Sequence, residues 1–560
     1  MGKVLNFVID QNRYRNLAEK HAEKGDFFGA LGFLFSARSV SENYQVIMDI
    51  AYLYSDMGLY DLSNKFWFLY IDKAPKDKIS IAYEELAINY FYLDNFWTSS
   101  FYFHKKLDVD GHISKEGLDQ EIIDFFSGEE LRKSAYRLVY PFERADYSHN
   151  IKTAKHFLAI GAFNEAKKQL ENIPYSIRSE ETSGELALAS YMTEDFETAE
   201  KVCRQSLEIN GENVIAYCHL STVCSMKKDI ENAEFYYQKA LQSRKSAKGE
   251  EYNLATCAIE RGDHKTANQC LEKIVEERPY EISMRFFYGI SFLNLYEYQK
   301  AYEQFKYSLM INPDDNVVYF YLNLAKELSD GEQKDAKILP LKYEKELPKK
   351  VVKRYIESIR KIALEPVKII GQLKKKEVRQ MIEWALFCSE GQVTRDALFI
   401  LSTCNNPYCI KTIKNTLLDP EIREETKRVL IYIFIAMGRK EKFGVTVGNF
   451  YLKIKPKKLD CERAEDGEIY FSAYALCMAR VVFWESENLD IIGTTIDRIF
   501  HAFSGIITEA DVTNEELAGF LLSECKFKWV KNEKDVKKLF DISTEKLHKL
   551  QSIYRGEKND

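Results

Sequence analysis

An alanine recurs in this sequence at a fixed interval of 34 residues. It stands at Ala199, Ala233, Ala267 and Ala301. Amphipathic helices placed at random would not keep one spacing over three consecutive intervals, so the pattern indicates a repeated structural unit. Such a unit cannot bury its apolar face alone and must stack on its neighbours. The chain is therefore expected to fold as an array of helical hairpins.

Other landmarks move with the alanine. A small residue recurs in the first helix of each unit, at Ala187, Ser221, Ala255 and Gly289. A large residue of the second helix faces it, at Tyr237, Leu271 and Phe305, and a proline closes the unit at Pro279 and Pro313. Small residues let the two helices approach closely, large ones fill the gap left by the next unit, and proline ends the second helix.

A 34-residue helix–turn–helix with these landmarks resembles the tetratricopeptide repeat family, and the resemblance covers residues 11–336. Units centred on Ala30, Ser63, Ser99 and Ala166 extend the pattern toward the N-terminus. The resemblance implies an all-α fold, a right-handed α-solenoid that binds a protein or peptide along a concave groove. Only 25 Gly and 11 Pro in 560 residues agree with long helices.

No motif is visible between Ser99 and Ala166, which are 67 residues apart, about twice the period. Residues 115–126 and 129–140 are amphipathic there, and we predict one degenerate repeat near residues 115–140. The array over residues 1–336 would then contain about nine units. The alternative is two domains joined by a flexible linker, although this region is apolar and lacks a linker composition.

Residues 337–376 are predicted to form a basic helical connector. Lys and Arg outnumber Glu by 13 to 5 over residues 342–379, in a chain of net charge −7. The basic stripe comprises Lys349, Lys350, Lys353, Arg354, Lys374, Lys375 and Lys376. One interpretation is a solvated face of connecting helices, and the other is a docking stripe for an acidic partner or a phosphate backbone.

A second helical region is predicted beyond the connector. Paired helices over residues 377–440 include the join Leu418–Arg423, which is similar to the turn of HEAT repeats, and this weaker similarity covers residues 378–437. Within residues 441–460, apolar residues alternate around Gly448-Asn449, which predicts a short β-hairpin.

Residues 461–560 return to a helical pattern. The last two predicted helices, Glu533–Phe540 and Thr544–Tyr554, faintly resemble a helix-turn-helix, but Asp541 stands where glycine is usual. The alternatives are DNA binding through this pair and a C-terminal helical cap.

No pattern for catalysis, metal binding or a cofactor is present. The nine histidines are scattered, and neither His-Glu-x-x-His nor a glycine-rich phosphate loop occurs. We predict that the chain is not an enzyme; the alternative, a site of dispersed residues, would need a deep pocket with convergent titratable groups. Eleven cysteines without a Cys-x-x-Cys pair, no secretory signal and no apolar run long enough for a membrane span predict a cytoplasmic location.

The resemblance projects the groove onto this sequence, because the first helix of each repeat lines it in that family. The partner-binding candidates are Arg15, Glu19, Asp49, Tyr52, Glu84 and Glu85 in the first three units, and Tyr252, Phe286 and Ile290 near the other end. The first group is acidic and the second is mixed and apolar. Family members that clamp a C-terminal carboxylate use basic residues, and only Arg15 has a suitable charge here.

These observations predict a non-catalytic scaffold or adaptor whose acidic groove binds a basic or helical segment of a protein partner. The chain's own stripe over residues 342–379 is a second candidate occupant, which would occlude the groove intramolecularly. The alternative function is a regulator associated with nucleic acid, with the repeats as its sensor and the basic stripe or C-terminal helices as its binding region.

Overall fold

The computed structural model describes residues 11–110, 122, 137–139, 144–243, 250–331, 338–388, 391–439, 441–455, 467–481, 489–503, 506–507 and 511–555. The chain divides into two compact units. The first contains Met1–Tyr70 and Ala74–Pro348, and the second contains Lys349–Asp560 with the short segment Ile71–Lys73. Each unit is described separately below.

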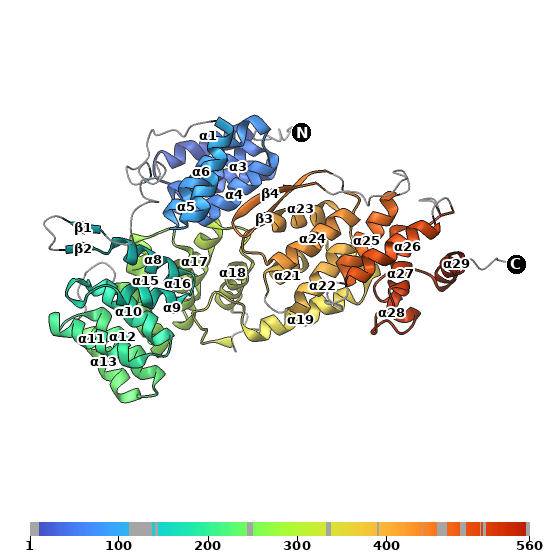
Figure 1. Ribbon diagram of the computed structural model, residues 1–560. Helices are drawn as coiled ribbons and strands as arrows, with labels where there is room; N and C mark the ends of the chain where they lie inside the picture. Colours follow the sequence, from blue (N-terminus) through green and yellow to red (C-terminus); the bar gives the residue numbers. More distant parts are fainter. Residues whose placement is uncertain are drawn as a thin grey trace, which may run out of the picture. The chain divides into compact units, whose positions relative to one another are not determined.

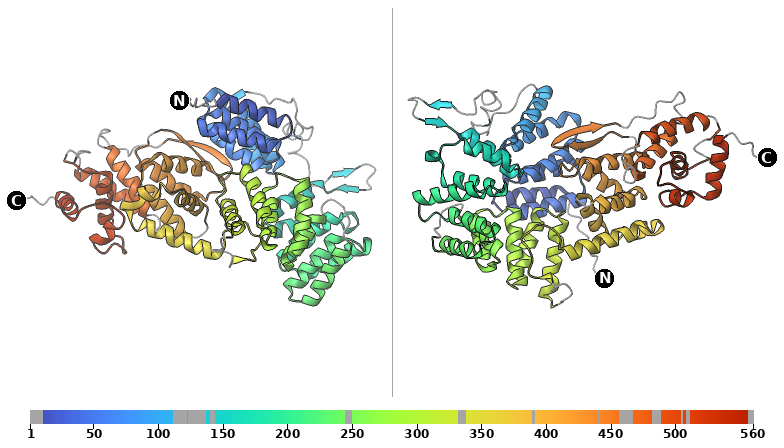
Figure 2. Two further views of the ribbon diagram at one scale, coloured as in Figure 1. Left: turned by 180° about the vertical axis from the view of Figure 1, so that it is seen from behind. Right: turned by 60° about the horizontal axis from the view of Figure 1, so that its bottom comes forward.

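The first unit is built from consecutive helical hairpins (Figure 1; two further sides are seen in Figure 2). Its helices are α1 (Gln11–Ala22), α2 (Phe27–Val40), α3 (Tyr44–Asp56), α4 (Tyr60–Lys73), α5 (Ser80–Tyr92), α6 (Phe96–Asp110), α8 (Ser148–Ala159), α9 (Phe163–Glu171), α10 (Glu180–Met192), α11 (Phe196–Ile209), α12 (Val214–Met226), α13 (Ile230–Gln242), α14 (Glu250–Arg261), α15 (His264–Glu277), α16 (Ile282–Asn294), α17 (Tyr298–Ile311) and α18 (Asn316–Ser329). The predicted α-solenoid is confirmed.

The turn between the two helices of a hairpin uses the same backbone conformation each time. One residue has a positive φ, at Gly25, Gly58, Asp94, Gly161, Glu194, Lys228, Gly262 and Tyr296. An aspartate often follows and caps the second helix: Asp263 Oδ1 accepts a hydrogen bond from the backbone N–H of Thr266 at 3.1 Å. The left-handed residue reverses the chain, and the cap starts the next helix.

The small residues at the repeat positions bring the paired helices into contact. Ala199, Ala233, Ala267 and Ala301 are completely buried. A Cβ added at Gly289 would lie 2.6 Å from the ring of Phe305, so glycine is needed there. Serine replaces the alanine at Ser63 and donates a hydrogen bond to the Ala51 carbonyl at 2.8 Å across the hairpin. The core of the unit forms along these contacts.

The first hairpin of this unit also packs against its last one. Phe28 of α2 lies 5.3 Å from the rings of both Tyr280 and Tyr307. The buried guanidinium of Arg285 covers the ring of Phe28 at 5.6 Å and donates to the Pro279 carbonyl. Helices α2 and α17 are therefore in direct contact, a tertiary contact that the repeat pattern does not predict.

A β-hairpin occupies the end of the segment predicted as a degenerate repeat. Strand β1 (Arg137–Val139) pairs antiparallel with β2 (Arg144–Asp146). The predicted helix over residues 129–140 is therefore wrong at residues 137–139. Pro141 agrees with this, because a proline cannot continue a helix and it stands in the sequence between the two paired segments. Residues 111–121 and 123–136 lie outside the described residues, so the rest of this repeat stays a prediction.

The second unit is helical with one more hairpin of strands. Its helices are α19 (Lys349–Ala363), α20 (Ile369–Gln372), α21 (Lys376–Phe387), α22 (Gly391–Ser402), α23 (Pro407–Leu418), α24 (Glu424–Ala436), α25 (Gly467–Val481), α26 (Asp490–Phe503), α27 (Asn514–Glu524), α28 (Glu533–Lys537) and α29 (Thr544–Arg555). The predicted hairpin is confirmed: β3 (Phe443–Val447) pairs with β4 (Phe450–Ile454) across Gly448-Asn449. The likeness to HEAT repeats stays a prediction, as does DNA binding, although α28 is shorter than the predicted helix over 533–540.

Candidate functional site

Arg15 and Asp49, both predicted groove residues, are paired with each other. Arg15 lies on α1 and Asp49 on α3, with Nε 2.5 Å from Oδ2 and Nη2 3.1 Å from Oδ1. Two hydrogen bonds of this kind hold both side chains in place. The charge of Asp49 is therefore neutralised within the chain, while Glu19 remains exposed on α1.

Glu84 is also neutralised, by a lysine that the projection from sequence did not include. Lys106 of α6 is buried and lies 2.9 Å from Glu84 and 2.8 Å from Asp110. A buried lysine on the second helix of a repeat could be recognised from sequence only by its spacing of four residues from Asp110.

Glu85 is the carboxylate that the fold leaves most strongly perturbed in this region. Burial first, and then the neighbouring charges of Glu84 and Asp56, together raise its pKa to about 7. Burial, and next the charge of Glu85, also raises the pKa of Tyr52, whose ring packs edge-on to Trp67 at 5.0 Å. Among the described residues, no cation pairs with Glu85. The three predicted residues Tyr52, Glu84 and Glu85 therefore lie together, around an incompletely compensated negative charge.

A second charged group lies on the first helices of the next repeats, where the sequence projection named no candidates. Lys155 of α8 is 2.9 Å from Glu181 and 3.7 Å from Glu185, both on α10. Burial raises the pKa of Glu185 to about 7, and its Oε2 is buried without a hydrogen bond. His219 of α12 is fully buried, and burial lowers its pKa to about 4. His219 therefore stays neutral at pH 7 and acts as a packing residue.

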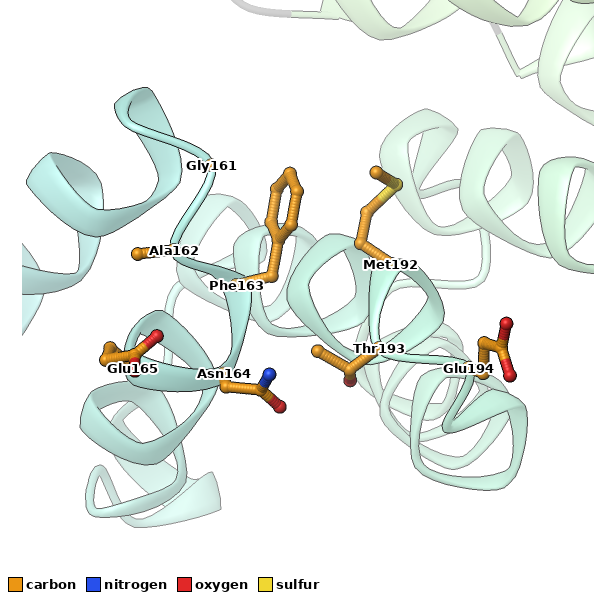
Figure 3. Close-up of a pocket in the computed structure, with 8 residues that line it drawn as sticks. All are labelled: Gly161, Ala162, Phe163, Asn164, Glu165, Met192, Thr193 and Glu194. Atoms are coloured by element: carbon orange, nitrogen blue, oxygen red, sulfur yellow. The ribbon is translucent and has the colours of Figure 1, made fainter. Parts of the chain in front are cut away.

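One pocket among the described residues is an open depression between two hairpin turns. It is lined by Gly161, Ala162, Phe163, Asn164, Glu165, Met192, Thr193 and Glu194 (Figure 3). Figure 3 shows the side chains of Phe163 and Met192 directed to the same side. No base, nucleophile and anion-stabilising group converge on it, so the depression offers a surface contact and not a catalytic arrangement.

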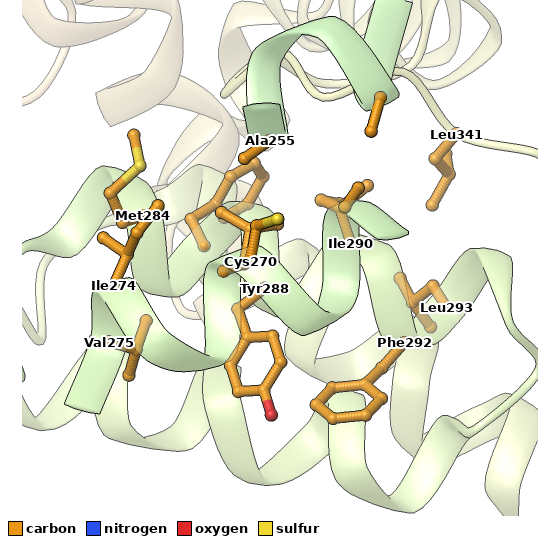
Figure 4. Close-up of a cluster of buried hydrophobic side chains, with 14 of the residues drawn as sticks. Ala255, Cys270, Ile274, Val275, Met284, Tyr288, Ile290, Phe292, Leu293 and Leu341 are labelled. Carbon is orange, nitrogen blue, oxygen red and sulfur yellow. The ribbon is translucent and has the colours of Figure 1, made fainter. Parts of the chain in front are cut away.

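The apolar end of the predicted groove is covered by the chain itself. Phe286 and Ile290 are completely buried, so they do not line an open surface, whereas Tyr252 is exposed. Leu341 lies beside Ile290 and Leu293 (Figure 4). The prediction of Phe286 and Ile290 as accessible anchors is therefore wrong. Phe286 packs against the rings of Phe305 and Tyr321 within the array, and Ile290 lies in the same buried cluster as Leu341.

That segment, residues 338–347, is fixed by specific hydrogen bonds. The side chain of Asn294 donates to the Leu341 carbonyl at 2.8 Å and accepts from the Leu341 N–H at 2.7 Å. Tyr343 stacks on His264 at 5.8 Å and contacts the ring of Phe287 at 6.4 Å. We call residues 338–347 the strap. It covers the apolar end of the groove.

The basic stripe lies in the second unit and is solvated. Lys349, Lys350, Lys353 and Arg354 are exposed on α19, and Lys374, Lys375 and Lys376 are exposed around the start of α21. Val351 and Ile359 are the buried residues of α19. This arrangement agrees with a solvated helix face and keeps every cation of the stripe accessible.

Two kinds of site are missing from the part of the chain that the structure describes. No group of three or more His, Cys, Asp or Glu side chains there could hold a metal ion. No helix there combines the length and the apolar character needed to cross a membrane.

Comparisons with known proteins agree with the repeat. Residues 226–306 match the family described as anaphase-promoting complex, cyclosome, subunit 3. A comparison with curated proteins finds no match. The family match over residues 226–306, the 34-residue landmarks and the stacked hairpins support repeats of the tetratricopeptide type in the first unit.

Solved structures of repeat proteins are similar at low identity. The tetratricopeptide repeat protein YrrB, described as having an unusual peptide-binding site, is 19% identical, with 31% of this chain and 87% of that chain covered and a TM-score of 0.24. The TPR2AB domain of yeast Sti1 is 15% identical, with 48% and 98% covered and a TM-score of 0.20. Yeast Tom70 is 12% identical, with 88% and 97% covered and a TM-score of 0.26. What these proteins bind does not transfer to this chain.

Proposed function

We propose that this protein is a non-catalytic scaffold that binds a basic segment of a partner protein at the first helices of its first three repeats. The observation that carries the proposal is Glu85. Its carboxylate is largely buried beside Glu84 and Asp56, and among the described residues it has no cation of its own. A lysine or arginine of a partner would supply the missing charge, and the ring of Tyr52 nearby would contact that cation.

The surrounding geometry favours this end of the array. Lys106 and Arg15 are already engaged, so they neutralise Glu84 and Asp49 without opposing a cationic ligand at Glu85. The exposed carboxylate of Glu19 adds to the negative field, which speeds association and selects a basic partner. At the other end Phe286 and Ile290 are buried, which leaves Tyr252 as the predicted contact residue still exposed there.

Affinity capture with the full chain, followed by mass spectrometry, tests the proposal. The variant Glu85→Lys reverses the charge while the Glu84–Lys106 pair stays intact. The matched control is Glu276→Lys, the same change at an exposed position on α15. We expect wild type and the control to capture the same partner and Glu85→Lys to lose it. Identical partners for all three proteins would show that the acidic site is assigned wrongly.

The alternative of a nucleic-acid-associated regulator makes a different prediction. Binding through the exposed stripe on α19 and α21 would weaken steeply with salt, because each phosphate contact releases counterions. A gel shift of the full chain that is absent or insensitive to salt would remove this alternative.

We also propose a cytoplasmic location. All ten cysteines that the structure describes are free, and nine of them are buried. Buried free thiols are typical of proteins from a reducing compartment. Imaging of the full chain with a fluorescent tag would test this location directly.

A further inference from the structure

Three aliphatic side chains protrude from the turn that follows α19 in the second unit. Leu364 is 74% exposed, Val367 is 96% exposed and Ile370 is 62% exposed. They lie close together in the sequence on one turn, so they form a single apolar tip. Single exposed aliphatic residues are ordinary on a protein surface, but three on one turn indicate a binding surface for an apolar partner.

The turn presents these side chains from a fixed backbone. The Leu364 N–H donates to the Arg360 carbonyl at 3.0 Å, and the Lys368 N–H donates to the Glu365 carbonyl at 2.9 Å. Ile369, between Val367 and Ile370, is completely buried, and Leu373, three residues after Ile370, is nearly so; both belong to the core of the unit. The exposure of the tip is therefore built into the fold, because its neighbours hold the turn in place.

Positive charge flanks the tip in the sequence. From Arg360 to Lys376 the chain has six cations and one carboxylate, Glu365. Lys368 is 2.7 Å from Glu365, and both remain largely solvated. The cations are Arg360, Lys361, Lys368, Lys374, Lys375 and Lys376, all exposed. An apolar tip with six exposed cations within six residues of it in the sequence matches a partner that combines an apolar interior with a negative surface.

We propose that this turn inserts into the surface of an anionic membrane. Aliphatic tips partition into the acyl boundary, while long lysine side chains extend to the lipid phosphates. Nucleic acid fits less well, since bases are held by aromatic stacking and the tip has no aromatic residue. A protein partner fits less well too, because its contact points are usually tryptophan, tyrosine and arginine. The tip belongs to the second unit, whereas the groove belongs to the first.

Co-sedimentation of the full chain with vesicles tests this proposal. The vesicles are made of phosphatidylcholine alone or of phosphatidylcholine mixed with phosphatidylserine. We expect binding to the mixed vesicles that falls as salt is added, and weak binding to phosphatidylcholine alone. Val367→Glu should weaken binding about tenfold, because it removes the aliphatic side chain that would insert into the membrane and adds a charge that the anionic lipids repel. Replacing Lys374, Lys375 and Lys376 by Gln should reduce the salt dependence.

The matched control is Ile230→Glu, the same change of chemistry at an isoleucine of the first unit that is 66% exposed. It should bind mixed vesicles as the wild type does, and thermal unfolding followed by circular dichroism should show that both variants fold. The proposal is overturned if the wild type binds neither kind of vesicle, or if Val367→Glu binds like the control. Capture of an acidic protein through this turn, without vesicle binding, would also overturn it.

Discussion

Lys427 places an ionisable amine in the core of the second unit. Its side chain is buried and donates hydrogen bonds at 2.7 Å to the carbonyl and to the hydroxyl of Thr446, which joins α24 to β3. Burial lowers its pKa to about 8, against the partial opposition of Asp419 and Glu424. The carbonyl and the hydroxyl of Thr446 therefore bind an amine whose charged form is disfavoured by burial.

This lowered pKa predicts how stability depends on pH. Below about pH 8 the folded and unfolded chains both hold the proton, so Lys427 adds no pH dependence. Between about pH 8 and 10.4 the unfolded chain holds more protons, and raising the pH therefore favours the folded state. We expect the unfolding free energy of the wild type, relative to that of Lys427→Met, to rise by about 3 kcal/mol across this window. Urea unfolding of both proteins measures it, and parallel pH curves would contradict the buried amine.

The raised pKa of Glu85 predicts a pH dependence of partner binding. Its pKa of about 7 means that the carboxyl is mostly neutral at pH 6 and mostly ionised at pH 8. A cationic partner binds the ionised form, so affinity for a basic partner should rise about tenfold between these two values. Titration calorimetry with the captured partner measures it. Glu85→Gln should remove this dependence, and a pH profile unchanged by that variant would place the titrating group elsewhere.

At the scale of elements, the turn between the two helices of each hairpin has the same backbone conformation in every repeat described. Gly262 has a φ of +73°, and a Cβ added there would have no atom within 4 Å, so alanine would meet only backbone strain. We expect Gly262→Ala to lower the unfolding free energy by about 1 kcal/mol. Lys228 occupies the same turn one repeat earlier, with a φ of +64°. Lys228→Gly should be neutral or stabilising, and denaturant unfolding that shows the same sign for both variants would contradict this account.

The periodic landmarks predicted the hairpins because each one reports a contact within a repeat or with the next repeat. Ala267 packs inside its hairpin, and its burial follows from spacing alone. The β1–β2 hairpin was missed because its residues share no landmark with the array. The charge predicted at Glu84 and the exposure predicted at Ile290 were wrong for the same reason. Lys106 neutralises Glu84, and Leu341 packs in the buried cluster of Ile290, and the repeat period relates neither pair of residues. Charge and exposure at a groove position depend on such contacts.

At the scale of the whole molecule, the strap joins a distant segment to the array. The side chain of Asn294 satisfies both backbone groups of Leu341, across a separation of 47 residues. All of these groups are buried, so losing the amide leaves a donor and an acceptor without compensation. We therefore expect this pair of hydrogen bonds to hold the strap over the apolar end of the predicted groove.

Asn294→Leu tests this dependence, because leucine keeps the size of the side chain and removes both hydrogen bonds. We expect local opening of the strap to become easier by about 2 kcal/mol, so exchange of the Leu341 amide should accelerate about thirtyfold. Hydrogen exchange read by mass spectrometry over residues 338–347 measures it. Tyr343→Phe is the control, since it keeps the ring on His264 and both hydrogen bonds between Asn294 and Leu341. It removes only the hydroxyl, which contacts His264 at 3.1 Å and the side chain of Asn294. Equal exchange in Asn294→Leu and wild type would contradict this role of the hydrogen bonds. It would mean that apolar packing of Leu341 alone holds the strap in place.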